Sequence, residues 1–154
     1  LIRFGSAHGT SPTPRPAARE ALRALRTALM TGPDLPARLD SYKRAYGFSR
    51  EALQGGPLVC VCHSWLLYPQ NRQVLSPSSN IVSFQGDFDL VGWEETETFG
   101  DAWRVFGAAS RGPLENLPEG TSMQRGFKRW LLEGHKTGEG RGVLVFDGKT
   151  LLTR

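Results

Sequence analysis

Residues 57–84 read PLVCVCHSWLLYPQNRQVLSPSSNIVSF, and this stretch decides the fold of the chain. Within it, residues 58–67 are dense in Val, Cys, Trp and Leu, without strict alternation of apolar and polar side chains. Such a run is typical of an interior strand covered on both faces, so we expect it at the centre of a sheet. Two prolines then bracket a helical turn, and Ser79 or Asn80 follows as the N-cap of a short helix.

The other patterns predict further helices and strands. A capping box from Thr121 to Gln124 begins a helix that Gly134 ends, and GHKTGEGRG, residues 134–142, is interpreted as a turn. We expect strands at 1–4, 88–98, 102–106, 143–146 and 149–153, of which 88–98 and 102–106 form a hairpin. Helices are expected at 17–30, 37–46, 49–54 and 121–133. Residues 6–16 are expected to form a loop. This order predicts a mixed sheet of the α/β (α+β) class in a single domain, residues 1–154.

Length and composition limit the class of protein to which this chain can belong. A chain of 154 residues is long enough to bury one core, and none of its apolar runs approaches the length needed to cross a bilayer. We therefore expect a soluble, cytoplasmic protein. Cys60 and Cys62 are separated by one residue, which predicts two reduced thiols on the same face of a strand. The chain begins at Leu1 rather than Met, which we interpret as either a fragment of a longer protein or a processed product.

Charge is segregated along the chain. Residues 1–54 carry nine basic and four acidic side chains, residues 55–119 carry three and eight, and residues 120–154 carry seven and three. Two interpretations are open: basic segments that hold a polyanion such as coenzyme A beside an acidic segment that holds a cationic acceptor, or a solvated surface of mixed sign. The basic helix at 17–30 lacks an RNA-binding aromatic signature, so nucleic-acid binding is not expected.

Two motifs carry a resemblance to a known family. The first is an H-S-W-L-L-x-P strand end followed by S-N-I-x-x-F, and the second is an L-P-x-x-T-S-x-Q helix start. They correspond here to His63, Ser64, Trp65, Leu66, Leu67, Pro69, Ser79, Asn80, Ile81 and Phe84, and to Leu117, Pro118, Thr121, Ser122 and Gln124. The chain resembles the GNAT-like C-terminal domain of a bacterial acyltransferase family. The resemblance implies a GNAT-like acyltransferase fold, acyl transfer from an acyl-CoA to an amine, and an N-terminal partner domain.

We assign His63 and Ser64 as the candidate catalytic residues. His63 is either a histidine satisfied by a structural hydrogen bond or a proton acceptor beside a bound substrate. Ser64 either donates to a thioester carbonyl or bonds to a neighbouring backbone group. On a regular strand Cys62 and His63 point to opposite faces, so this pair cannot act as nucleophile and base.

The candidate cofactor-binding residues are Cys62, Trp65, Leu66, Leu67 and Asn80. Acyl transfer from coenzyme A needs a groove in which an extended pantetheine pairs with strand backbone, and the strand before Pro69 is expected to offer it. GNAT enzymes also carry R/Q-x-x-G-x-G/A between a strand and a helix, and no such motif follows Leu67. The cysteines and histidines lack metal-ligand spacing, so no metal is expected.

Three functions are therefore open. The first is an acyl-CoA-dependent N-acyltransferase, with acetyl-CoA or another acyl-CoA as donor, a small-molecule amine as acceptor, and no membrane partner. The second is a non-catalytic ligand-binding or protein-interaction module on the same fold, which the missing pyrophosphate motif favours. The third is a hydrolase that uses Cys62 as its nucleophile.

Overall fold

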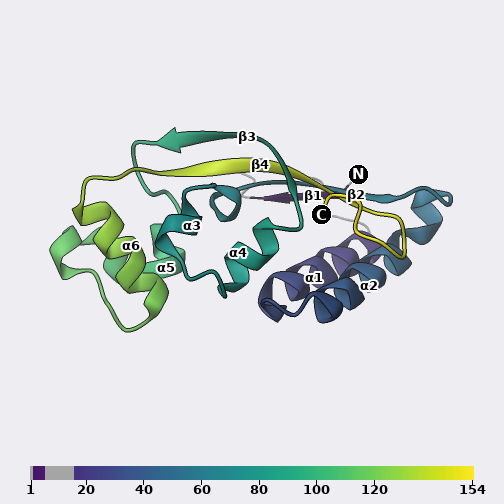
Figure 1. Ribbon diagram of the computed structural model, residues 1–154, viewed down its shortest axis with the longest axis horizontal. Helices are drawn as coiled ribbons and strands as arrows, with labels where there is room; N and C mark the ends of the chain where they lie inside the picture. Colours follow the sequence, from purple (N-terminus) through teal and green to yellow (C-terminus); the bar gives the residue numbers. More distant parts are fainter. Residues whose placement is uncertain (1, 6–15) are drawn as a thin grey trace.

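The computed structural model describes residues 2–5 and 16–154, and a mixed sheet forms one layer of it (Figure 1). The strand order is β1-β2-β4-β3. Strand β1 (Ile2–Gly5) is parallel to β2 (Leu58–Ser64), whereas β4 (Thr137–Phe146) is antiparallel to both β2 and β3 (Asp89–Thr96). The α/β class and the interior position of β2 are confirmed. The predicted loop at 6–16 and residue 1 fall outside the described residues, apart from residue 16.

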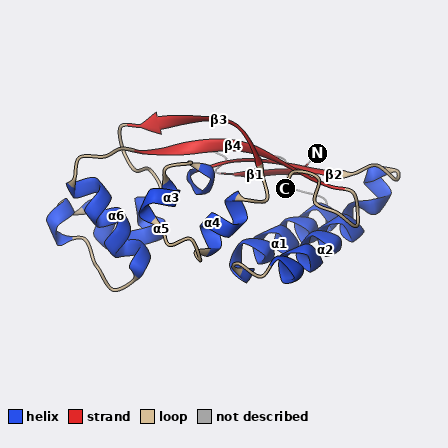
Figure 2. Cartoon of the chain, viewed as in Figure 1, coloured by secondary structure: helices blue, strands red, loops and turns tan. Residues whose placement is uncertain are grey.

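The labelled helices lie on one side of the sheet (Figure 2). They are α1 (Pro16–Thr31), α2 (Leu35–Leu53), α3 (Asn71–Val74), α4 (Asn80–Gln85), α5 (Ala102–Phe106) and α6 (Ser122–Leu132), with 3-10 turns η1 (Trp65–Leu67), η2 (Gly107–Arg111) and η3 (Leu114–Asn116). Side chains of β2 alternate in accordance with this one-sided cover, because Cys60 and Cys62 are buried whereas His63 is exposed. No helix in the described part of the chain is long and apolar enough to cross a bilayer.

Three clusters of buried apolar residues lie on the helix side of the sheet, and two of them are large. In the first, Ala21 of α1 and Tyr42 of α2 pack with Phe146 of β4. In the second, Trp65 of η1 packs with Phe127 of α6. The second cluster surrounds the end of β2, so the turn that leaves this strand is anchored in the core.

Several predicted helices are confirmed with their caps. Helix α6 begins with the predicted capping box, in which the Gln124 backbone N–H donates to Thr121 Oγ1 and the Thr121 N–H donates to Gln124 Oε1, both at 3.1 Å. Gly134 follows this helix with φ of 81°. Helix α1 spans the predicted residues, and Ser79 Oγ accepts from the Ile81 N–H at the start of α4.

Helix α2 is one continuous helix, so the prediction of two helices at 37–46 and 49–54 is wrong. The gap between the two predicted helices contains Gly47, which is exposed and lies inside α2. A glycine in a helix interior costs about 1 kcal/mol relative to alanine, and burial of large residues outweighs this. Tyr42 supplies that burial, since it is 0% exposed.

Strand β2 ends at Ser64, three residues before the predicted end at Leu67, and the chain turns under the sheet as η1. Ser64 Oγ accepts from the Leu66 N–H at 3.3 Å, and the Tyr68 N–H donates to the Trp65 carbonyl at 3.1 Å. The expectation of a strand covered on both faces is also wrong, because the outward residues of β2 are only half-buried or exposed.

Residues 102–106 form helix α5, not the predicted second strand of a hairpin. Arg104 Nε donates to Asp101 Oδ1 at 2.8 Å, one turn earlier, while Val105 and Phe106 are buried in the second cluster. A five-residue apolar segment does not distinguish a strand from a helix by periodicity alone. Strand β3 consequently pairs with β4 and not with its sequence neighbour.

The glycine-rich segment predicted as a turn at 134–142 is largely strand, because β4 begins at Thr137. Gly138, Gly140 and Gly142 occupy alternate positions on the helix side of β4. A Cβ on Gly140 would stand 2.1 Å from the Leu67 carbonyl oxygen, so glycine is what allows η1 to pack directly on the strand. The edge strand predicted at 149–153 does not form. This segment makes one isolated bridge, between Phe146 and Leu151.

A buried ion pair joins α2 to the segment before β3. Arg38 donates from Nε to Asp87 Oδ2 at 2.7 Å and from Nη2 to Oδ1 at 3.1 Å, and both side chains are at most 1% exposed. Tyr42 and Arg154 also donate to the Asp87 carboxylate, at 2.7 and 2.8 Å. Burial, and then the charge of Asp87, raises the pKa of the Tyr42 hydroxyl far above its ordinary value, so Tyr42 remains a donor.

Candidate functional site

His63 lies at the carboxyl end of β2, on the sheet face opposite the helices. Its Nε2 stands 3.1 Å from Glu139 Oε2 and 3.9 Å from Glu94 Oε1, and the side chain is 46% exposed. Arg141 is the register partner of His63, and its Nη2 donates to Glu94 Oε1 at 3.1 Å. We call these four residues the His63 cluster. An accessible imidazole beside carboxylates is an arrangement that can accept and hold a proton.

The sequence identified His63 but did not assign a partner to it. Glu139 and Arg141 both lie in the glycine-rich segment that was interpreted as a turn. The signal was the alternation of G-E-G-R-G, which places the two charged residues on one face of a strand and the glycines on the other. Reading this alternation as a strand would have put both charges on the outward face.

Ser64 and Cys62 point toward the helices. Ser64 is 5% exposed and its Oγ caps η1, which matches the structural alternative given for this residue. Cys62 is 0% exposed and packs with Leu67 and Phe84. The structure therefore places these two side chains on the opposite face from His63.

The remaining predicted binding residues lie in η1 and at the start of α4. Trp65 is 7% exposed, and its ring contacts Phe99 and Phe127 edge to face, each with a centroid separation of 5.8 Å. Leu66 is half-buried and Leu67 is buried. Asn80 is exposed at the start of α4, where its Nδ2 donates to the Met30 carbonyl at 3.3 Å.

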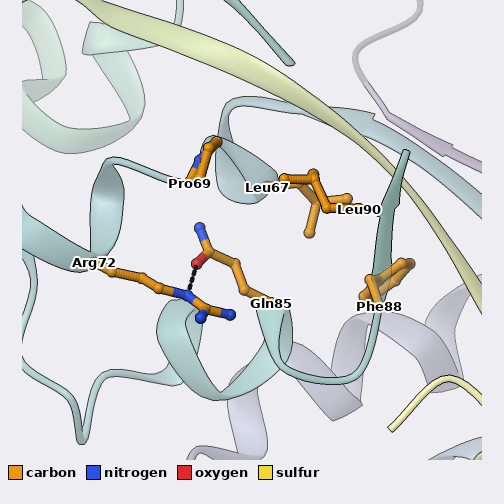
Figure 3. Close-up of a pocket in the computed structure, with 6 residues that line it drawn as sticks. All are labelled: Leu67, Pro69, Arg72, Gln85, Phe88 and Leu90. Carbon is orange, nitrogen blue, oxygen red and sulfur yellow. Dashed lines mark hydrogen bonds between the residues drawn. The ribbon is translucent and has the colours of Figure 1, made fainter. Parts of the chain in front are cut away.

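A pocket of about 190 Å³ lies on the helix side, between η1, α4 and the start of β3 (Figure 3). Its lining residues are Leu67, Pro69, Arg72, Gln85, Phe88 and Leu90. Of the residues predicted from the sequence, this pocket includes Leu67 and none of the others. The described residues contain no group of three His, Cys, Asp or Glu side chains that could hold a metal ion.

The thiols of Cys60 and Cys62 are buried and unreactive. Burial raises the pKa of both Cys60 and Cys62 to about 12, and both cysteines are free. A thiolate is the nucleophilic form of cysteine, so Cys62 stays protonated and unreactive near neutral pH. This environment does not support the hydrolase interpretation.

The raised thiol pKa values predict a loss of stability at alkaline pH. The folded state keeps these protons after the unfolded state, whose thiols have an ordinary pKa near 9.0, has begun to release them. Their contribution to stability is therefore complete below pH 9 and falls as pH rises from 9 toward 12, by about 1.4 kcal/mol per pH unit for each thiol. Urea unfolding at pH 8, 10 and 11 measures this slope.

The Cys60→Ala, Cys62→Ala double variant is the control for this prediction. At pH 8 its free energy of unfolding should be lower than that of the parent, because methyl groups replace buried thiols. Its alkaline slope should be shallower. An unchanged slope would show that the two thiols are not the groups whose titration is linked to unfolding.

Residues 34–144 match the model of the family described as the GNAT-like C-terminal domain. The chain belongs to this family. The GNAT-like fold predicted from the two motifs is thereby confirmed for the domain. A search of curated protein sequences finds no match.

Solved structures similar to this GNAT-like domain are acyltransferases. One, in complex with decanoyl-CoA and teicoplanin, is 27% identical with a TM-score of 0.59, over 75% of this chain and 38% of its own. Another, in complex with CoA and 10C-teicoplanin, is 30% identical with a TM-score of 0.59, over 73% of this chain and 36% of its own. The domain thus spans little more than a third of the length of these relatives.

Proposed function

We propose that this GNAT-like domain belongs to an acyltransferase that moves an acyl group from an acyl-CoA to an amine. The observation that carries the proposal is the similarity to acyltransferases that hold decanoyl-CoA or CoA, over about three quarters of the chain. Two of these structures also hold a form of teicoplanin, which supports a small molecule as acceptor. We further propose that the remaining length of the relatives corresponds to an N-terminal partner domain.

The proposed reaction needs one protein group to take a proton. The acceptor nitrogen attacks the thioester carbonyl, the new C–N bond forms, the C–S bond breaks, and CoA leaves as a thiol after gaining a proton. We place His63 as the group that accepts the ammonium proton of the acceptor and passes a proton to the sulfur. The Glu139 carboxylate, 3.1 Å from Nε2, would stabilise the imidazolium formed in between.

The other predicted site residues would act by holding the backbone at the end of β2 in place. The parallel strands β1 and β2 end together, with Gly5 opposite His63. Ligands of open α/β sheets bind outside the carboxyl ends of such strands, and we propose that the pantetheine arm lies there. Ser64, Cys62, Trp65, Leu66 and Leu67 would hold this strand end in place, since the buried members of the group anchor it in the core. Asn80 would contact the bound acyl-CoA from the exposed start of α4.

His63→Ala tests the catalytic assignment. We expect CoA release from decanoyl-CoA, with aminosugars and amino acids offered as acceptors to the full-length protein, to fall about 100-fold or more in kcat. The melting temperature should change little, because the side chain is 46% exposed. His135→Ala is the matched control, since His135 is an exposed histidine 3.6 Å from a carboxylate, that of Glu133. This control should keep full activity.

Two outcomes would count against this account. Equal losses of stability and activity in His63→Ala would make His63 a packing residue. Binding of decanoyl-CoA without CoA release for any acceptor would favour the non-catalytic module.

A further inference from the structure

We propose that the pocket lined by Arg72 binds a small apolar carboxylate. This pocket, named the Arg72 pocket from here on, is the one of about 190 Å³ on the helix side of the sheet. The inference does not depend on acyl transfer. Three properties of the pocket support it: its size and apolar walls, a guanidinium oriented by a buried glutamine, and its separation from the His63 cluster.

The size and walls of the Arg72 pocket suit a short apolar group. Leu67, Phe88 and Leu90 supply apolar side chains, and Leu90 is 43% exposed at its edge. An apolar cavity of about 150 Å³ is large enough for benzene, so about 190 Å³ accommodates a body of six to eight carbons. A drug-sized ligand needs a site of about 300 Å³ or more, so the pocket selects a small molecule.

A buried glutamine orients the guanidinium of Arg72, which is exposed. Gln85 is 6% exposed, and its Nε2 donates to the Leu66 carbonyl at 2.7 Å and to the Tyr68 carbonyl at 3.0 Å. Its Oε1 accepts from Arg72 Nε at 3.0 Å, as Figure 3 shows. Both amide protons of Gln85 therefore hold the turn at η1, and its oxygen orients Arg72 through one hydrogen bond.

The chemistry of Arg72 selects an anion. The contact with Gln85 uses Nε, and Arg72 has no ion pair with a carboxylate of the described residues. The terminal NH₂ groups form a planar fork, whose geometry matches the two oxygens of a carboxylate. One arginine compensates one negative charge, which fits a monocarboxylate better than a phosphate dianion. The predicted ligand therefore has an apolar body and one carboxylate.

The Arg72 pocket is separate from the His63 cluster. Leu67, one wall of the pocket, packs beneath Gly140 and Gly142 on the helix side of β4. His63 and Arg141 project from the opposite face of the same sheet. A ligand in the pocket and a group at His63 would thus have the sheet between them, so both can be bound at once.

Octanoate is the probe that tests this proposal. We expect it to bind the chain with a dissociation constant of about 1 mM or tighter, and to shift the amide resonances of residues 66–72 and 85–90 in ¹⁵N spectra. Octanol, which keeps the body and lacks the charge, should bind about tenfold more weakly, and acetate should not bind measurably. Arg72→Gln should weaken octanoate about tenfold, and Arg72→Lys, which keeps the charge and loses the fork, should lie between.

The control is Arg50→Gln, because Arg50 is an exposed arginine near the end of α2, away from the pocket. It should bind octanoate as the parent does. The proposal is overturned if Arg72→Gln and the parent bind octanoate equally, if octanol binds as tightly as octanoate, or if octanoate does not bind at about 10 mM. Competition between octanoate and decanoyl-CoA would also overturn it, whereas failure of decanoyl-CoA to bind would leave it standing.

Discussion

Gly140→Ala is expected to lower the free energy of unfolding by about 3 kcal/mol or more, or to prevent folding. The added Cβ would lie 2.1 Å from the Leu67 carbonyl oxygen and 2.4 Å from its carbon. These are backbone atoms, so no side-chain rotation relieves the clash. The turn η1 would have to move away from β4, taking Trp65 out of the second apolar cluster. Urea denaturation followed by circular dichroism measures the loss.

Gly92→Ala is the control for this substitution. Gly92 lies in β3, directly opposite Arg141 of β4, and nothing stands within 4 Å of the position of its Cβ. Its free energy of unfolding should stay within about 0.5 kcal/mol of the parent value. Similar losses for both variants would mean that the close packing of η1 on β4 is not what requires glycine.

Asp87→Ala is expected to cost about 3–5 kcal/mol of stability, because it leaves the Arg38 charge buried without a partner. Arg38 is 1% exposed, and its remaining contact would be the 2.6 Å hydrogen bond from Nη1 to the Gly32 carbonyl. The Tyr42 hydroxyl would lose its acceptor as well. Asp89→Ala, two residues further along and exposed, should change stability by less than about 0.5 kcal/mol.

A double variant separates the pair from its individual members. Arg38→Met, Asp87→Leu replaces both charges by apolar side chains of similar length, so no uncompensated charge is left in the interior. We expect it to be more stable than either Asp87→Leu or Arg38→Met alone. A double variant whose loss equals the sum of the two single losses would show that Arg38 and Asp87 are not energetically coupled.

Local signals were sufficient for much of the fold. The capping box at Thr121 and the Ser79 cap both act within four residues of chain, so they can be read from sequence. The segments that were misread depend on distant partners. Residues 102–106 become helix because Phe106 packs in the second cluster, and the glycines of β4 become strand because η1 packs on them.

In the candidate site, too, local features could be predicted from the sequence, whereas contacts between distant residues could not. His63 was recognised from the H-S-W-L-L-x-P motif at a strand end. Its partner Glu139 is 76 positions away, and this contact depends on the register of β2 with β4. The contact between Arg72 and Gln85 likewise depends on how α3 faces α4. Such pairings are set by tertiary packing and have no sequence period of their own.

Calorimetric titration of this chain with decanoyl-CoA tests the central claim most directly. The account predicts saturable binding that CoA displaces, since both ligands would share the carboxyl ends of β1 and β2. Acetyl-CoA in parallel shows how much the acyl chain contributes to the affinity. The absence of heat and of any thermal shift with decanoyl-CoA, CoA and acetyl-CoA at about 1 mM would contradict the assignment of this domain to acyl-CoA chemistry.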